Sequence, residues 1–389
     1  PHPEYYNSRR LCYIIDSIKN MEEALLLRSI YEELFYLISV FSPYNERENN
    51  LRLKNLAQNE IEEIISTDEY ENNSFGQNVR NTFAEGDFFI RVSNENKDKV
   101  NLKIERLLHL IFESDIITPT PDENAMYVAK SAAGNSACLS RQVGASITDN
   151  IGNVVSKGWN DVPKYGGNLY QEGNIQDDRC KFRGYCSNDK QKINIVESIV
   201  DSIVRDNELN IAFKNEDNSI NMVMLKRFSD KLRSSKIKDL IEFSRSVHAE
   251  MHAIISGSQL SGSKMVGGKL FCTTYPCHNC ARHIIVAGIN EIYYIEPYIK
   301  SLCIELHNDA ITEDENEDGK VKILMYDGVA PRKYLTFFSK RGERKDKNGK
   351  FVPREYDKVI PKMSKTLQAL STLEQQAIHS LTECGFQEN

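Results

Sequence analysis

The chain has 389 residues, of which 40% are apolar and 27% charged, a composition typical of a folded protein with more than one domain. Its 49 basic and 56 acidic residues give a net charge of -7, which argues against a protein whose main task is to hold a nucleic-acid backbone. No apolar stretch approaches the roughly 18–20 residues that span a bilayer, and the N-terminus lacks the pattern of a signal peptide, so we expect a soluble cytoplasmic protein.

The first 115 residues predict an alternation of strands and helices. We expect strands over 11–15, 34–41 and 88–92, and helices over 21–33, 46–54 and 102–113. This alternation favours an α/β domain with a parallel sheet. Neither of the glycine-rich phosphate-binding motifs, G-x-x-x-x-G-K-[ST] and G-x-G-x-x-G, occurs in the chain, so this domain is degenerate or its phosphate loop lies before Pro1.

A proline-rich connector predicts the boundary between two domains. The segment 118–122 contains Pro119 and Pro121, which fix an extended backbone, and Thr120 or Asp122 can cap the helix that follows. We therefore expect a first domain over 1–117 and a second domain over 118–389.

The second domain is also predicted to alternate strands and helices, around an irregular insert over 161–245. Before the insert we expect a helix over 124–139 and a hairpin of strands over 142–148 and 154–159. Within the insert we expect helices over 193–206 and 223–232. After it, we expect helices that begin at His248, at Cys277 and near Ser301, and strands over 269–274, 291–296 and 321–326.

The nine cysteines are odd in number and spread over a long chain, which argues against a disulfide scaffold. In a reducing compartment, clustered cysteines serve as metal ligands or catalytic groups more often than as disulfides. Two pairs are clustered, Cys277 with Cys280 and Cys180 with Cys186.

Two short motifs carry the chemistry. His248-Ala249-Glu250 has the pattern H-x-E, and the segment 276–280 that follows has the pattern P-C-x-x-C; together they are the signature of zinc-dependent deaminases. A catalytic Zn²⁺ has three protein ligands and an open position for water. We predict His248, Cys277 and Cys280 as these ligands, because C-x-x-C at the start of a helix brings both sulfurs to one metal and the helix N-terminus stabilises thiolates.

Glu250 is the predicted general acid and base. It follows His248 by two residues in the first turn of the same helix, where its carboxylate can face the water that the metal activates. It would take a proton from water and pass it to the ring nitrogen and then to the leaving amine. A protease of the H-E-x-x-H type is excluded, because Ala249 and not glutamate follows the first histidine. A purely structural zinc site is the remaining alternative.

A second group of metal-ligating residues lies partly in the insert. Cys180 and Cys186 could share a zinc ion with His252 or Cys138, which lie near the deaminase helices. A closed site with four ligands has no room for substrate, so this second zinc would be structural. The alternative is a core histidine with satisfied hydrogen bonds and two loop cysteines.

These motifs and their surroundings resemble deoxycytidylate deaminases. The resemblance extends to the segments 140–145 and 158–163. The chain is more similar to bacterial anti-phage dCTP deaminases, in which a P-loop kinase-like domain precedes a cytidine-deaminase-like domain. The segments 12–16, 35–43 and 127–144 carry that likeness.

The resemblance implies a five-stranded mixed sheet flanked by helices and a catalytic Zn²⁺. It implies a free deoxycytidine nucleotide as substrate, with deamination of dCTP to dUTP and also of dCMP to dUMP, in antiviral defence through depletion of dCTP. It further implies a homo-oligomer, and a contact between Asn160 and the sugar of the nucleotide. From charge and position we add Arg141 and Lys164 as phosphate contacts.

Several alternatives stay open. The chain could be a housekeeping dCMP deaminase, or an enzyme that edits nucleic acid, although its acidic net charge argues against the latter. A regulatory protein that uses the zinc fold without catalysis would lack the acid and base, whereas Glu250 is present. The N-terminal domain has no catalytic motif, and we predict that it senses a ligand or gates the activity.

Overall fold

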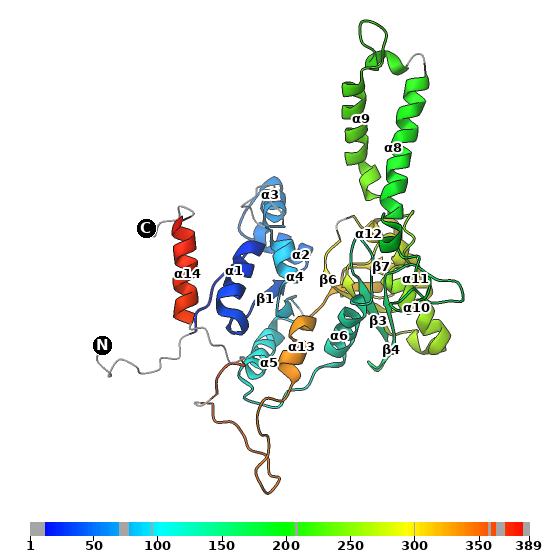
Figure 1. The fold of residues 1–389 in the computed structure, drawn as a ribbon. Helices are drawn as coiled ribbons and strands as arrows, with labels where there is room; N and C mark the ends of the chain where they lie inside the picture. Colours follow the sequence, from blue (N-terminus) through cyan, green and yellow to red (C-terminus); the bar gives the residue numbers. More distant parts are fainter. Residues whose placement is uncertain are drawn as a thin grey trace. The chain divides into compact units, whose positions relative to one another are not determined.

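The computed structural model describes residues 12–69, 78–94, 96–206, 209–298, 300–356, 359–362 and 370–383. The chain divides into two compact units (Figure 1). Unit 1 comprises Pro1–Thr118 together with Asp327–Asn389, and unit 2 comprises Pro119–Tyr326. Within the described ranges, no helix combines the length and the apolar character that a membrane crossing requires.

Unit 1 is built on a small sheet in which β1 (Ile38–Phe41) pairs in parallel with β2 (Phe88–Arg91), and β2 pairs antiparallel with β9 (Gly328–Val329). Its core joins Phe88 and Ile90 of β2 to apolar residues of α5 and α13. The helices of the unit are α1 (Met21–Tyr31), α2 (Tyr44–Arg52), α3 (Gln58–Glu69), α4 (Val79–Ala84), α5 (Val100–Phe112), α13 (Tyr334–Phe338) and α14 (Leu370–Glu383), and its 3₁₀ turns are η2 (Glu32–Leu34), η3 (Lys97–Lys99) and η7 (Pro331–Lys333).

Unit 1 differs from the sequence-based expectation in its first strand and at its C-terminal side. Residue 11 lies outside the described residues, and residues 12–15 have no regular structure, so the strand over 11–15 is wrong. Tyr13 and Ile14 stay 83% and 92% exposed, because an apolar run forms a strand only where a sheet offers it a partner.

The domain boundary is also different, because the residues after 326 join unit 1 and not the deaminase-like part. β9 pairs with β2, and Arg332 donates from Nε to the buried carboxylate of Asp87 at 3.0 Å. These contacts link parts of the chain that are far apart in sequence, so no local pattern could indicate them. The division after Thr118 lies one residue from the expected one.

Unit 2 contains a six-stranded mixed sheet in the order β4-β3-β5-β6-β8-β7. The pairs β3–β4 and β3–β5 are antiparallel, and the strands from β5 to β7 pair in parallel. The five expected strands are present, and the sixth, β7, has two residues. The strands are β3 (Gly144–Thr148), β4 (Val154–Trp159), β5 (Lys269–Thr274), β6 (Glu291–Glu296), β7 (Ile311–Thr312) and β8 (Val321–Met325).

Helices cover this sheet, and Thr120 caps the first of them as expected. Its side chain accepts from the Glu123 backbone while the Glu123 carboxylate accepts from the Thr120 backbone, which is a capping box. The helices of the unit are α6 (Pro121–Ala133), α7 (Cys180–Arg183), α8 (Ser187–Arg205), α9 (Met222–Ser234), α10 (Ala249–Leu260), α11 (His278–Val286) and α12 (Cys303–His307), with 3₁₀ turns η4 (Leu209–Phe213), η5 (Lys236–Asp239) and η6 (Gly262–Met265).

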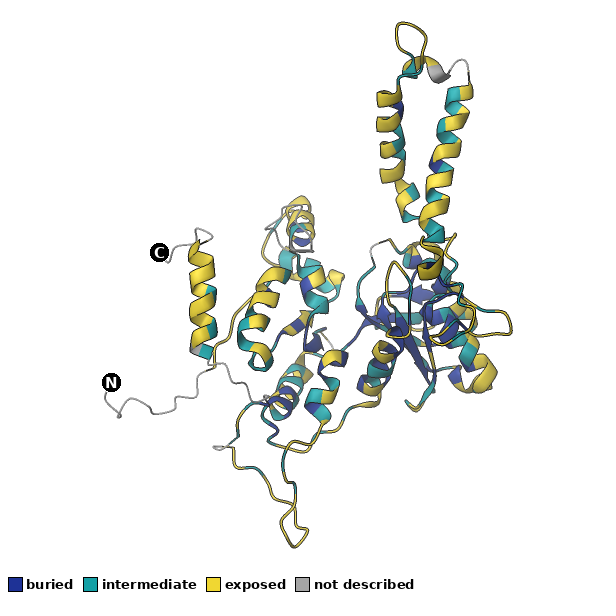
Figure 2. Cartoon of the chain, in the orientation of Figure 1, coloured by how far each residue is buried: buried dark blue, intermediate teal, exposed yellow. Residues whose placement is uncertain are grey.

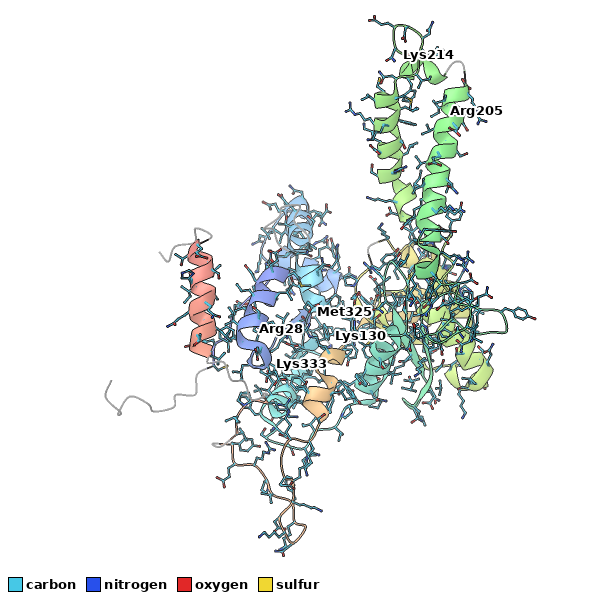
Figure 3. The ribbon with its side chains drawn as sticks, in the orientation of Figure 1. Arg28, Lys130, Arg205, Lys214, Met325 and Lys333 are labelled. Atoms are coloured by element: carbon cyan, nitrogen blue, oxygen red, sulfur yellow. The ribbon has the colours of Figure 1, made fainter. Side chains whose placement is uncertain are left out.

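The insert forms a helical arm from α8 and α9, which pack against each other and extend away from the sheet of unit 2 (Figure 1). Val196 and Leu225 are its buried residues, while the rest of its surface is largely exposed, in contrast to the buried strands (Figure 2). Arg205 and Lys214 lie at the far end of the arm (Figure 3). The base of the arm returns to the sheet.

Two glycines let helices approach the sheet closely. A Cβ atom at Gly158 of β4 would lie 2.4 Å from both the Ala249 oxygen and the Ala253 nitrogen of α10. A Cβ atom at Gly144 of β3 would lie 1.9 Å from the Ala129 oxygen of α6. Side chains alternate between the faces of a strand, and Gly144 pairs with Trp159, so the two glycines admit helices on opposite faces.

Replacing Gly158 by alanine should therefore force α10 away from β4. We expect Gly158→Ala to lower the free energy of unfolding by about 1–3 kcal/mol, as overpacking of a core does. Chemical denaturation measures this change. Gly134→Ala is the matched control, because its Cβ would meet its nearest neighbour at an ordinary 3.4 Å. Equal stability of the two variants would contradict the close packing of α10.

Candidate active site

Two helix N-termini meet at the predicted metal ligands. His248 is the N-cap residue of α10, and Cys277 is the N-cap residue of α11, both with extended backbone. Cys280 lies in the first turn of α11 and is fully buried. The positive end of a helix dipole favours thiolates, so this local geometry suits sulfur ligands.

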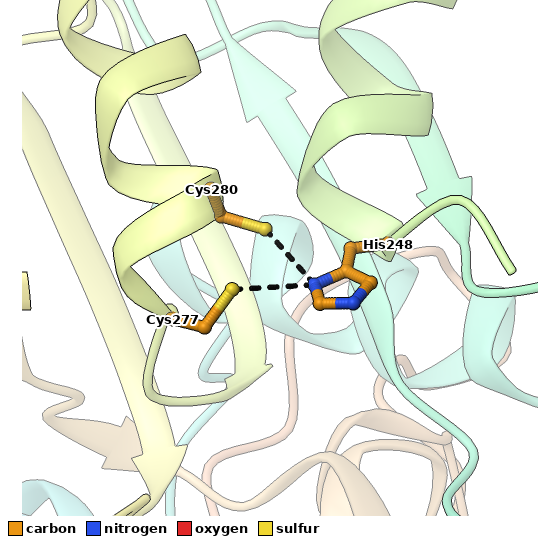
Figure 4. Close-up of side chains that lie close together, drawn as sticks. All are labelled: His248, Cys277 and Cys280. Atoms are coloured by element: carbon orange, nitrogen blue, oxygen red, sulfur yellow. Dashed lines mark hydrogen bonds between the residues drawn. The ribbon is translucent and has the colours of Figure 1, made fainter. Parts of the chain in front are cut away.

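The three side chains converge on one point (Figure 4). The Nδ1 atom of His248 lies 3.3 Å from the Sγ atom of Cys277 and 3.3 Å from that of Cys280. All three ligand atoms lie within 4.8 Å of one another. Tetrahedral zinc with ordinary bond lengths would separate nitrogen and sulfur by roughly 3.5 Å, so the site fits Zn²⁺. Across the described ranges, this is the one group of three or more such side chains that could hold a metal ion.

Hydrogen bonds and charges in this group favour the thiolate form of Cys277, which is the form that binds a metal. A hydrogen bond from Cys280 and another from His248 lower the pKa of Cys277 to about 4 against the effect of burial. For His248, burial alone would lower the pKa, but the hydrogen bond and negative charge of Cys277 raise it to about 9. Burial also raises the pKa of Cys280 well above its usual value. Zinc binding would therefore release the protons of His248 and Cys280.

Glu250 lies beside this group in the first turn of α10. Its side chain is buried, with 4% of the residue exposed. Burial raises the pKa of the Glu250 carboxyl, and the negative charge of Cys277 raises it further, while His248 opposes the shift. A carboxyl group whose pKa is raised towards neutrality can both accept and donate a proton, which is what a general acid and base must do.

A cavity of about 190 Å³ opens onto these residues. Its wall includes His248, Glu250 and Cys277, so two of the three ligands and the proposed acid and base line one space. Among the described residues that line it, Glu250 is the only acidic one, whereas Arg141 and Arg245 are both basic. Its other polar lining residues are Ser140, Asn160, Ser187, Asn188, Ser244, Ser246, Thr274, Tyr275 and Tyr298. The cavity therefore suits an anionic ligand with hydrogen-bonding groups.

Of the three residues predicted to bind substrate, Arg141 and Asn160 line the cavity and Lys164 does not. Arg141 lines the cavity, with its guanidinium 5.7 Å from the centre of the Tyr298 ring. Asn160 also lines it, but its side chain holds the loop before β3: Oδ1 accepts from the Val143 backbone at 2.7 Å, and Nδ2 donates to the Arg141 carbonyl at 2.9 Å. A contact between Asn160 and a sugar remains a prediction.

Lys164 does not line the cavity, and its contact with a phosphate remains a prediction. It lies in a turn in which its backbone nitrogen donates to the Asn168 carbonyl at 3.1 Å. A lysine that follows a strand closely in sequence can point in any direction once the chain turns, so position alone could not place it.

The second predicted zinc site is not assembled. His252 is buried against Trp159, where Nδ1 accepts from the Trp159 backbone at 3.2 Å and Nε2 lies 3.0 Å from Oδ1 of Asn168. Both ring nitrogens are therefore used, and His252 is a core residue and not a metal ligand. Cys138, Cys180 and Cys186 line the cavity, but no third ligand joins any two of them within the part of the chain that the structure describes.

Sequence reasoning missed the contribution of the insert to the cavity. Asn188 of α8, Ile241 and residues 244–246 form part of its wall, as does Tyr298, which follows β6. The position of Arg245, three residues before His248, was the one available signal. The insert is long and irregular in sequence, so its return to the metal ligands could not be inferred.

Comparison with known proteins agrees with this geometry. Residues 119–296 match the family model for the cytidine and deoxycytidylate deaminase zinc-binding region, a range that contains all three ligands and Glu250. Unit 2 therefore contains a zinc-binding deaminase domain.

Individual relatives cover parts of the chain. A deoxycytidylate deaminase from Enterobacteria phage T2 is 28% identical over 176 residues, which are 45% of this chain and 80% of that protein. ComE operon protein 2 from Bacillus subtilis (strain 168) is 44% identical over 54 residues, which are 14% of this chain and 28% of that protein. The chain thus matches less than a third of that relative's length.

Among solved structures, the dCMP deaminase from the cyanophage S-TIM5 in apo form is 19% identical and has a TM-score of 0.29. That match covers 54% of this chain and 100% of the other chain.

Zinc content tests the ligand assignment. We expect about one zinc per chain in the purified protein and loss of that zinc in Cys277→Ser and Cys280→Ser, because a site with two remaining ligands binds zinc far more weakly. Elemental analysis measures the content. Cys186→Ser is the control and should keep its zinc. Loss of zinc from this control would instead support a second site at the insert cysteines.

Proposed function

We propose that this protein is a zinc-dependent enzyme that removes the amino group from the cytosine base of a deoxycytidine nucleotide by hydrolysis. The observation that carries the proposal is a single cavity lined by His248 and Cys277 of the metal-ligand group, by the buried Glu250 and by two arginines. The two arginines favour a nucleotide over a free nucleoside, because guanidinium groups bind phosphate strongly. The net charge of -7 favours a free nucleotide over a polynucleotide as substrate.

The residues suggest how the reaction proceeds. Bound Zn²⁺ would lower the pKa of water towards neutrality and so supply hydroxide at neutral pH. Glu250 would take a proton from the attacking water and donate it to the ring nitrogen N3 as the water oxygen adds to carbon C4. The proton of the new C4 hydroxyl would then pass through Glu250 to the amino group, and the C4–N bond would break as the C4=O bond forms, so that ammonia leaves with uracil as the product base.

We propose dCTP as the substrate, with dCMP as the second candidate. The preference for dCTP rests on the resemblance described from the sequence, and two arginines at one cavity are consistent with more than one phosphate. dCMP is favoured by the relative from phage T2, which is a deoxycytidylate deaminase. Three expectations remain predictions from the sequence. They are a role in antiviral defence, a homo-oligomeric assembly, and a kinase-like N-terminal domain that senses a ligand or gates the activity.

Ammonia release measures the activity directly. The zinc-loaded protein should release ammonia from dCTP or dCMP and not from dATP. Glu250→Gln should lower this rate by about 10²–10⁴-fold, because it removes the proton transfer.

Glu305→Gln, an exposed residue of α12 outside the cavity, is the matched control and should keep the activity. Turnover of dCMP without dCTP would identify a dCMP deaminase. If the zinc-loaded protein released no ammonia from either nucleotide, the proposed function would be wrong.

A further inference from the structure

A segment that we call the strap, residues 239–246, joins the arm to α10 and crosses the wall of the active-site cavity. It begins at the end of η5 and ends just before His248. Ile241, Ser244, Arg245 and Ser246 all line the cavity. The insert therefore supplies part of the surface that a substrate would touch.

Both ends of the strap are fastened to unit 2. At one end, Asn188 uses its whole side-chain amide: Nδ2 donates to the Leu240 carbonyl at 2.9 Å, and Oδ1 accepts from the Phe243 backbone at 3.3 Å. Just beyond the other end, the Val247 backbone donates to the Asp161 carbonyl at 2.9 Å. The strap is thus held on each side of Arg245 in the sequence.

Asp161 and Arg179 belong to a buried charged group beside Asp178, a residue of the insert that contacts the strap. Arg179 is 3% exposed, and its NH2 group donates to Asp177 at 2.5 Å. The Asp161 carboxylate lies 3.8 Å from the same guanidinium and accepts from the Ala137 backbone at 2.9 Å. This buried charged group keeps the neighbouring Asp178 in place.

The backbone of Asp178 orients Arg245. Its NH1 group donates to the Asp178 carbonyl at 2.9 Å, and the residue is half-buried. A guanidinium has five N–H donors in a planar fork, so one hydrogen bond to a fixed carbonyl sets the direction of the others. Arg141, by contrast, is exposed and lies over Tyr298. Less conformational entropy is lost when a ligand binds the already ordered Arg245.

The charges along the cavity indicate what Arg245 would bind. A cytosine base must reach Glu250 and the metal ligands, so the rest of the nucleotide must extend along the remaining wall. That wall carries two guanidiniums and several serine hydroxyls but no carboxylate besides Glu250, among the lining residues that are described. We infer that Arg245 binds a phosphate of the substrate nucleotide and that Asn188 is a positioning residue that acts through it. This inference rests on the proposed function.

Binding measurements test the role of Arg245 without turnover. In the zinc-loaded Glu250→Gln protein, we expect Arg245→Ala to weaken binding of dCMP by about 10- to 100-fold, as loss of a charged hydrogen bond does, and Arg245→Lys to recover part of it. Binding of deoxycytidine, which has no phosphate, should not change. Calorimetry gives both dissociation constants, and zinc content and unfolding midpoint report whether the variant folds.

Arg233→Ala is the matched control, because Arg233 is exposed on α9 and does not line the cavity. Equal weakening for dCMP and deoxycytidine, or no weakening for either, would overturn the role of Arg245. The proposed function is judged separately by ammonia release from the unmodified protein. A protein that binds dCMP through Arg245 but releases no ammonia would refute that function alone.

A double-mutant cycle tests Asn188. If Asn188 acts through Arg245, Asn188→Ala should raise the KM for the nucleotide with little change in kcat, and adding it to Arg245→Ala should cause no further loss. Asn194→Ala, an exposed residue on the same helix, is the control and should leave KM unchanged. Fully additive effects of Asn188→Ala and Arg245→Ala would show that Asn188 does not position Arg245.

Discussion

The chemistry of this protein depends on the approach of two helix N-termini to one point. α10 presents His248 and Glu250, and α11 presents Cys277 and Cys280. The approach of α10 is possible because Gly158 leaves no side chain between β4 and the helix. Gly158 therefore helps to position α10, whose N-cap residue is His248.

Burial at this point has two consequences. It removes water from the ligands, so the charges of Cys277 and His248 act strongly on each other, and their pKa values shift in opposite directions. It also disfavours the charged form of the Glu250 carboxyl and so raises its pKa. Burying an unpaired charge in such low-polarity surroundings would cost free energy, but Cys277 and His248 are paired with each other.

The insert contributes to the cavity that the metal ligands His248 and Cys277 also line. Ile241, Ser244, Arg245 and Ser246 of the strap form part of its wall, within the range that matches the family model. The arm itself buries few residues, and its base is held by hydrogen bonds from Asn188 and by the ion pair of Lys300 with Asp239 at 2.8 Å.

The sequence by itself indicated the group of His248, Cys277 and Cys280 that the structure brings together, the presence of Glu250 beside it, and most elements of unit 2, because these depend on neighbours within a few residues. In this chain, the motifs H-x-E and P-C-x-x-C place His248 and Cys277 at the N-caps of α10 and α11. Tertiary structure alone decided the role of His252, whose ring nitrogens meet Trp159 and Asn168, and the choice of Arg245 over Lys164 as a cavity residue. It also decided that residues after 326 join unit 1. Each of these outcomes depends on contacts between distant segments, and local patterns of hydrophobicity and charge contain no information about which distant segments meet.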